Sequence, residues 1–179
     1  MPSWLRELSL IASTAMIALS LNRKVSFRCD NSRLFVKFAV AMEKKRSYNS
    51  VERPAFTPDM ITSLMPDEVF VFGSNLAGMH GGGAAYAAFK HFGAVMGCGV
   101  GLRGQSYAIP TMQGGVETIK PYVDEFVAFA KDHPELFFYV TRIGCGIAGF
   151  RDREIAPLFA EAVPLPNVCL PESFVKLLA

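Results

Sequence analysis

From residue 56 onwards, short apolar runs alternate with segments whose apolar residues recur at helical spacing. Unbroken apolar runs such as 136–141 (LFFYVT) are typical of strands that are buried on both faces. The pattern predicts strands at 68–72, 106–110, 136–141 and 167–170, and a glycine-rich loop at 93–104 with room for a short strand. It predicts helices that start at 57–58 and that span 83–92, 115–131 and 152–163. Strands that alternate with helices predict an α/β fold with a largely parallel sheet.

Two glycine-rich segments follow two of the predicted strands. Gly73-Ser74-Asn75 and then Gly81-Gly82-Gly83 come after the first strand, and the segment 142–150 (RIGCGIAGF) comes after the strand at 136–141. Parallel sheets bind ligands beyond the carboxyl ends of their strands. Glycine lets the backbone approach a ligand, and a helix beginning near Gly83 directs its free N–H groups to the same place. The pattern predicts a pocket for an anion, most often a phosphate; the alternative is that the glycines only permit tight turns.

Charge is unevenly distributed along the 179 residues, although the net charge is only +2. Residues 1–55 contain ten Lys or Arg and four Asp or Glu, whereas residues 56–179 contain eight and twelve. An acidic body lacks the basic footprint of a nucleic-acid-binding domain, so we expect no nucleic-acid partner for residues 56–179. The content of hydrophobic residues, 51%, is that of a globular protein.

Residues 1–55 differ in kind from the rest of the chain. The apolar segment 8–21 lies between Arg6 and Arg23, and at fourteen residues it is short for a membrane span of about 20. It has the length of a signal-peptide core but no clear cleavage site. Three interpretations remain open: a leader, a biological start downstream at Met42 or Met60, or a helix of the fold. We predict a non-domain segment at 1–55 and a folded domain at 56–179.

Cysteine usage favours a cytoplasmic protein. The four cysteines show no CxxC spacing and no metal-ligand interval to a histidine, which is typical of reduced thiols. We therefore expect no metal site and no cofactor. A membrane-associated or exported form, with membrane contact, is expected only if residues 8–21 are a genuine leader.

Three of these segments resemble the macrodomain family: Gly73-Ser74-Asn75, the run from His80 to Ala85 (HGGGAA), and 142–150. The sequence RIGCG is especially similar to the corresponding loop of terminal ADP-ribose protein glycohydrolase, and the chain looks like a phage or bacterial macro-like branch. The resemblance covers about residues 68–174. It implies a three-layer α/β/α sandwich with a mixed, largely parallel sheet, and ADP-ribose or a related nucleotide diphosphate as ligand.

The resemblance also implies roles for individual residues. Asn75 matches the asparagine at the distal ribose, or it only forms a turn. Phe150 matches an aromatic residue that packs on the ribose, or it belongs to the core, while Asp67 and Glu68 are the nearest candidates for the acidic residue that aids adenine recognition. The expected ligand-binding residues lie in the two glycine loops: Gly73, Ser74, Asn75, His80, Gly81, Gly82, Gly83, Gly144, Cys145, Gly146, Ile147, Ala148, Gly149 and Phe150.

Catalysis is where the chain departs from the glycohydrolase pattern. The position of the family's catalytic aspartate is Ala148, and the region of its lysine corresponds loosely to 102–104, where Arg103 is a poor proton shuttle. The catalytic residues are therefore unknown. His80 and Asn75 are candidates for orienting a water in a substrate-assisted hydrolysis, and Cys145 is either a stabilised thiolate or a small packing residue.

Three hypotheses for function follow. The first is a module that senses or sequesters ADP-ribose or a related nucleotide without converting it. The second is a hydrolase that removes ADP-ribose from proteins or nucleotides. The third is a phage accessory or structural protein with a vestigial pocket.

Overall fold

The computed structural model describes residues 45–179, which lie within one compact unit that starts at Val40. Strands β1 (Lys45–Tyr48) and β2 (Val51–Pro54) form an antiparallel hairpin in this unit. The predicted boundary at residue 55 is therefore corrected, because Arg53 of the hairpin is 1% exposed. The predictions for the apolar segment 8–21 and for the start at Met42 lie outside the described residues.

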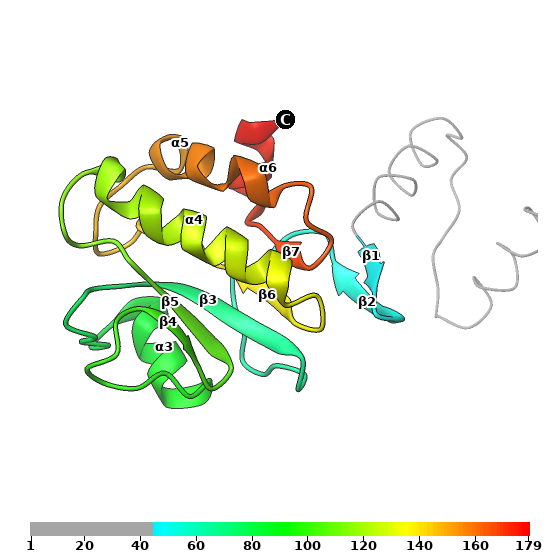
Figure 1. The fold of residues 1–179 in the computed structure, drawn as a ribbon, viewed down its shortest axis with the longest axis horizontal. Helices are drawn as coiled ribbons and strands as arrows, with labels where there is room; N and C mark the ends of the chain where they lie inside the picture. The colour runs from blue at the N-terminus through cyan, green and yellow to red at the C-terminus, as the bar shows by residue number, and fades with distance from the viewer. Residues whose placement is uncertain (1–44) are drawn as a thin grey trace, which may run out of the picture. The chain divides into compact units, whose positions relative to one another are not determined.

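The centre of the unit is a five-stranded sheet, which confirms the predicted mixed, largely parallel α/β class (Figure 1). Strand β3 (Glu68–Ser74) pairs in parallel with β5 (Ser106–Pro110) on one side and with β6 (Phe137–Val140) on the other. Strand β7 (Val168–Cys169) is parallel to β6, whereas β4 (Gly101–Arg103) is antiparallel to β5. Strand β4 lies near the end of the segment 93–104, which the sequence predicts as a loop with room for a short strand.

Helices pack on both faces of β3, whose side chains alternate between the faces. Val69 and Val71 join the cluster that includes Phe126 of α4 (Val116–Asp132). Phe70 and Phe72 join a second cluster with Ala88 of α3 (Gly83–His91). The unbroken apolar run thus reflects a strand that is covered on both sides, as its pattern predicts.

Two of the predicted helices differ from the structure. The segment predicted as one helix at 152–163 consists of α5 (Asp152–Ile155) followed by the 3-10 helix η1 (Ala156–Ala162), because Pro157 has no N–H for the α-helical bond. No helix forms at 57–58. Instead, the N–H and hydroxyl of Thr57 donate to the carbonyls of Leu170 and Cys169, and these bonds hold the segment in a non-helical course. A short helix α6 (Glu172–Leu178) ends the chain.

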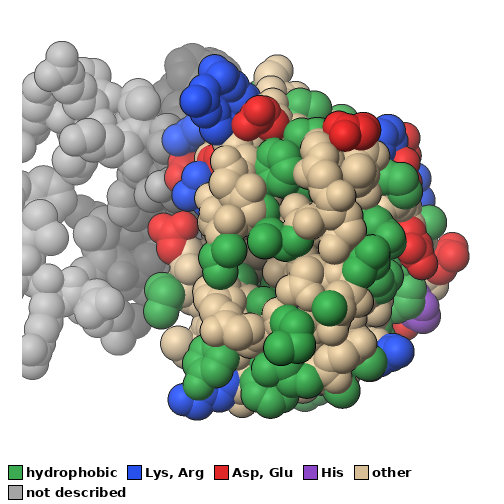
Figure 2. Space-filling view, turned by 90° about the vertical axis from the view of Figure 1, so that its left-hand side faces the viewer, with side chains coloured by type: hydrophobic (Ala, Val, Ile, Leu, Met, Phe, Trp, Pro, Cys, Tyr) green, Lys and Arg blue, Asp and Glu red, His purple; other side chains and the backbone are tan. Residues whose placement is uncertain are grey.

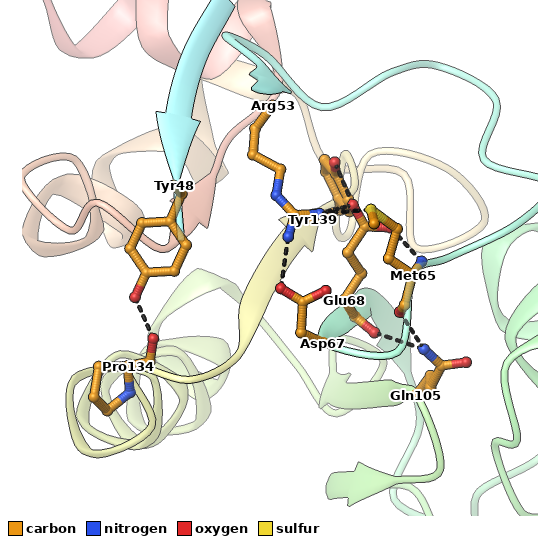
Figure 3. Close-up of polar contacts among 8 residues, drawn as sticks. All are labelled: Tyr48, Arg53, Met65, Asp67, Glu68, Gln105, Pro134 and Tyr139. Carbon is orange, nitrogen blue, oxygen red and sulfur yellow. Dashed lines mark hydrogen bonds and ion pairs between the residues drawn. The ribbon is translucent and has the colours of Figure 1, made fainter. Parts of the chain in front are cut away.

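Arg53 anchors the β1–β2 hairpin to the amino-terminal ends of β3 and β6 (Figure 3). Its guanidinium Nη2 lies 2.6 Å from Asp67, its Nη1 pairs with Glu68, and it lies over the ring of Phe137 at 4.9 Å. The hydroxyl of Tyr139 donates to the same Glu68 carboxylate at 2.9 Å. A buried charge requires this degree of pairing, so the hairpin is an integral part of the domain.

Helix length also bears on the question of membrane insertion. Within residues 45–179, no helix combines the length and the apolar content needed to cross a bilayer.

Candidate functional site

The two glycine-rich loops converge at the carboxyl ends of β3 and β6. A Cβ placed on Gly73, near the end of β3, would lie 3.3 Å from the backbone nitrogen of Gly144 in the second loop. Between the loops is a pocket of about 440 Å³, within the range of roughly 300–1,000 Å³ that is usual for small-ligand sites. The pocket lining includes most of the predicted ligand-binding residues: Gly73, Ser74, Asn75, Gly81, Gly82, Gly83, Gly144, Gly146, Ile147 and Ala148.

Asn75 shapes the first loop with both ends of its amide. Its Oδ1 accepts from the backbone N–H of Met79 at 3.0 Å, and its Nδ2 donates to the carbonyl of the same residue at 2.8 Å. Gly78 has a φ of +64°, and a Cβ there would overlap the backbone of Gly97 and Cys98. Asn75 therefore forms a turn, and each end of its amide retains one hydrogen-bonding position for a ligand.

Helix α3 directs an uncapped amino terminus at the pocket. Its N-cap residue Gly82 has extended backbone and no side chain to cap the helix, and its first turn contains no acidic residue. The first N–H groups of a helix have no partner within it, so those of Gly83, Ala84 and Ala85 are directed towards the pocket that these residues line. Together with the helix dipole, these groups make this wall of the pocket electropositive.

The second loop presents another run of N–H groups. The loop is closed by bonds from Cys145 to Arg142, from Gly149 to Gly146 and from Phe150 to Gly144. Among the residues that the structure describes, no hydrogen-bond acceptor binds the N–H groups of Gly146, Ile147 or Ala148. Successive free N–H groups of this kind form an anion-binding concavity.

Arg142 adds a positive charge to the same pocket. Its Nη2 donates to Oδ1 of Asp152 at 2.7 Å and its Nε to the same oxygen at 3.1 Å, which leaves Nη1 unused in this pair. Burial opposes ionisation of Asp152, yet hydrogen bonds, the one from Arg142 foremost, hold the pKa of Asp152 below its ordinary value. Among the described residues that line the pocket, none is an Asp or a Glu.

His80 lies outside the pocket, contrary to the prediction. Its side chain is fully buried, its Nε2 lies 3.1 Å from the carbonyl oxygen of Val95, and its ring meets Phe72 edge-on at 5.3 Å. It packs in this way because the turn that Asn75 forms directs residue 80 towards the face of the sheet on which Phe72 lies. A histidine without contact to the pocket cannot orient a water there. The prediction that His80 acts as a general base is therefore corrected.

Cys145 and Phe150 also lie outside the pocket lining. Burial, with the Asp152 carboxylate as a further cause, raises the pKa of Cys145 to about 12, and its Sγ donates to the carbonyl of Ile143 at 3.4 Å. The stabilised-thiolate interpretation is therefore wrong, since a thiol with this pKa stays protonated at neutral pH. The ring of Phe150 packs against the large core cluster, which favours the core interpretation, and Gly149 is likewise not part of the lining.

Three other candidate site residues lie at the end of the sheet opposite the pocket. Asp67 and Glu68 stand at the start of β3 and bind Arg53, so they cannot reach a ligand beyond its other end. Arg103 ends β4 opposite Ser106, the first residue of β5, and its Nη1 donates to the carbonyl of Leu102. The tentative match of these residues to the family's adenine and lysine positions is thereby overturned.

Several pocket residues escape the sequence motifs. Thr111 and Thr141 follow directly on β5 and β6, where the rule that ligands bind at the carboxyl ends of strands places them at the pocket. Met79 and Met112 also line the pocket, and no sequence pattern marks them as different from core methionines.

Comparison of the chain with protein-family models, with curated proteins and with solved structures finds no match. Within residues 45–179, no group of histidine, cysteine and acidic side chains is arranged to hold a metal ion. The chemistry of the pocket therefore has to be inferred from its own residues.

Proposed function

We propose that this chain binds ADP-ribose or a related nucleotide diphosphate in the pocket between the two glycine loops, as a sensor or binding module. The proposal includes a macrodomain-like, three-layer α/β/α arrangement. It is supported by the likeness of the two loops to that family and by the way their backbones meet at one edge of the sheet.

One observation carries the proposal: among the described residues, two separate runs of free N–H groups and one arginine line the pocket, and no carboxylate does. The runs are Gly83–Ala85 and Gly146–Ala148, and the arginine is Arg142. Such a surface offers hydrogen-bond donors and positive potential but little that can accept. Its chemical complement is an acceptor-rich anion, and a diphosphate has enough oxygens to meet both runs at once.

Binding is favoured over turnover because the pocket offers no proton shuttle. The position of the family's catalytic aspartate is Ala148, and Arg142 stays protonated at any physiological pH. Asn75 is already engaged in the loop turn. Hydrolysis of an ADP-ribosyl bond would therefore depend on the ligand's own phosphate to activate a water.

The direct test is thermal unfolding of the full-length chain with and without ADP-ribose. At 100 times its dissociation constant, a ligand that binds only the folded state adds about 2.7 kcal/mol of stability. Absence of a shift at millimolar ligand would overturn the proposal and favour a vestigial pocket. Release of free ADP-ribose from an ADP-ribosylated protein would instead identify a hydrolase.

Gly146→Glu and Gly146→Gln form a matched pair that probes the second loop. A Cβ at Gly146 meets nothing within 4 Å, so both side chains can be accommodated without strain. The carboxylate of the Glu variant faces the diphosphate, and the repulsion is about 1–4 kcal/mol, so its affinity should fall at least about fivefold. The neutral Gln variant should keep most of the affinity. Equal affinities for the two variants would show that no anion lies there.

A further inference from the structure

The hydroxyl groups of the pocket already donate hydrogen bonds to backbone carbonyls of the protein. Ser74 Oγ donates to the carbonyl of Asn75 at 3.3 Å, and Thr111 Oγ1 donates to the carbonyl of Ser74 at 3.2 Å. Thr141 Oγ1 donates to the carbonyl of Val71 at 2.9 Å. A hydroxyl has a single proton, so these groups can only accept from a ligand, and a sugar hydroxyl is a suitable donor.

The other polar side chains of the lining are partly committed. The amide of Asn75 binds the N–H and the carbonyl of one residue, Met79, so the edge on which an amide presents its donor and acceptor side by side is occupied, and one position at each end remains for a ligand. Arg142 uses Nε and one N–H of Nη2 on Asp152, which occupies one of the two paired edges of the guanidinium. The edge formed by Nη1 and the second N–H of Nη2 remains, and once it binds two phosphate oxygens it cannot also read a base.

Among the described residues, no carboxylate lines the pocket to read the amino group of adenine or cytosine, and the nearby Asp152 is engaged by Arg142. Asp67 and Glu68 lie at the opposite end of β3, a strand of seven residues and hence about 20 Å long. Both are paired with the buried Arg53, so they are unavailable as well as distant. Base-edge recognition needs donors and acceptors in a defined pattern, and the side chains of this pocket do not supply one.

The rim of the pocket is apolar. Met79, Met112 and Ile147 line the pocket and are 65%, 50% and 77% exposed. Figure 2 views the end of the molecule at which these loops lie, and apolar side chains and backbone fill its centre while charged side chains gather towards its margin. Thioether and aliphatic groups pack against the face of any base, because every base presents a π-face.

From these contacts we infer that the pocket selects nucleoside diphosphates by their diphosphate and ribose and is indifferent to the base. The N–H runs and Arg142 bind the diphosphate, the hydroxyl oxygens accept from the ribose, and the base packs on Met79, Met112 and Ile147. This inference rests on the proposed function and specifies its substrate class.

The test is calorimetric titration of the full-length chain with ADP-ribose, ADP, GDP, UDP and CDP at one salt concentration. Dissociation constants within tenfold of one another across the four diphosphates support the inference. A preference of more than tenfold for adenine over any other base overturns it while leaving the proposed function intact. If ADP-ribose and all four diphosphates fail to bind, the proposed function itself is wrong, so the two failures are distinguishable.

Met112→Ala tests the apolar rim, with Met60→Ala as a matched control. Met60 is 80% exposed and is not part of the pocket lining. Loss of one sulfur–aromatic contact should weaken ADP and UDP alike, by about two- to tenfold, and leave inorganic pyrophosphate unchanged. The Met60 variant should bind all three as the parent does. A loss for ADP with none for UDP, or an equal loss for pyrophosphate, would overturn the inference.

Discussion

At the scale of single residues, Arg142 owes its position to a carboxylate ten residues further along the chain. Asp152 holds the guanidinium through Nε and Nη2. Burial raises the pKa of Asp152, but hydrogen bonds from Arg142, Ser173 and Cys145 together lower it by more, so the pKa lies below its ordinary value. The folded state therefore binds the proton less tightly than the unfolded chain. The resulting stability is present above the ordinary Asp range and is lost as the pH falls through the folded pKa.

Asp152→Asn should lower the free energy of unfolding by only about 0.5–1 kcal/mol near neutral pH, because Arg142 is largely exposed to solvent. The variant and the parent should converge as the pH falls below the ordinary Asp range, about pH 4, and through the lowered folded pKa, where the parent carboxylate takes up its proton. Urea unfolding at several pH values measures the difference. A difference that stays constant with pH would show that the carboxylate charge is not what matters.

Cys145 should behave as an unreactive thiol. Because burial raises the pKa of Cys145 to about 12, its alkylation by iodoacetamide should stay slow up to about pH 9. Cys145→Ala should bind ADP-ribose with the affinity of the parent, since the residue is not part of the lining. Mass spectrometry after timed alkylation locates the modified cysteines, and rapid modification of Cys145 at neutral pH would contradict its burial.

At the scale of elements, helix α3 begins without the cap that would stabilise it. Gly82 has φ −160° and ψ 168°, a backbone that any residue adopts, and a Cβ there meets only the end of the Ile147 side chain, at 3.3 Å. A capping side chain would satisfy N–H groups that now face the pocket. Helix stability and anion binding therefore compete for the same donors.

Gly82→Asp should separate these two effects. The new carboxylate caps α3 and adds a few tenths of a kcal/mol to the free energy of unfolding, about the difference between Gly and Asp at an N-cap. The same charge should weaken ADP-ribose binding at least about fivefold, and Gly82→Asn, a neutral cap of equal shape, should weaken it less. Chemical denaturation and calorimetry measure the two quantities. Unchanged affinity in the Asp variant would mean that the helix terminus does not contact the ligand.

At the scale of the whole molecule, the pocket lies at the carboxyl ends of β3 and β6, and the β1–β2 hairpin is anchored at the amino-terminal ends of the same two strands. The hairpin contributes Arg53, whose single positive charge pairs with both Asp67 and Glu68 where β3 begins. Removing one member of a buried ion pair leaves an uncompensated charge, which typically costs about 3–5 kcal/mol. Ligand experiments therefore call for a chain that includes the hairpin and not a fragment that starts at residue 56.

Arg53→Met should lower the free energy of unfolding by about 3–5 kcal/mol. Lys120→Met is the control, because it breaks the ion pair of Lys120 with Asp124, both half-exposed, and should cost less than about 1 kcal/mol. Urea denaturation compares both variants with the parent. Equal losses in the two variants would show that Arg53 is not the anchor of the hairpin.

Local sequence was sufficient for strands β3, β5, β6 and β7, for helices α3 and α4 and for the two glycine loops, but not for the β1–β2 hairpin or α6. Apolar runs at 69–72 and 137–140 predict buried strands because such runs have few other stable environments, and the loops follow from the glycines behind them. The sequence could also have predicted the break between α5 and η1, since Pro157 has no N–H to donate to an α-helical hydrogen bond.

Only the tertiary structure decided which side chains share a site. The pairing of β3 with both β5 and β6 brings residues about seventy positions apart together at the carboxyl ends of these strands. The periodicity of the sequence carries no information about such neighbours. The burial of His80, the protonated state of Cys145 and the partners of Arg53 all depend on what covers each group. The sequence therefore determined the backbone of the pocket, whereas the fold determined its charge, its depth and its apolar rim.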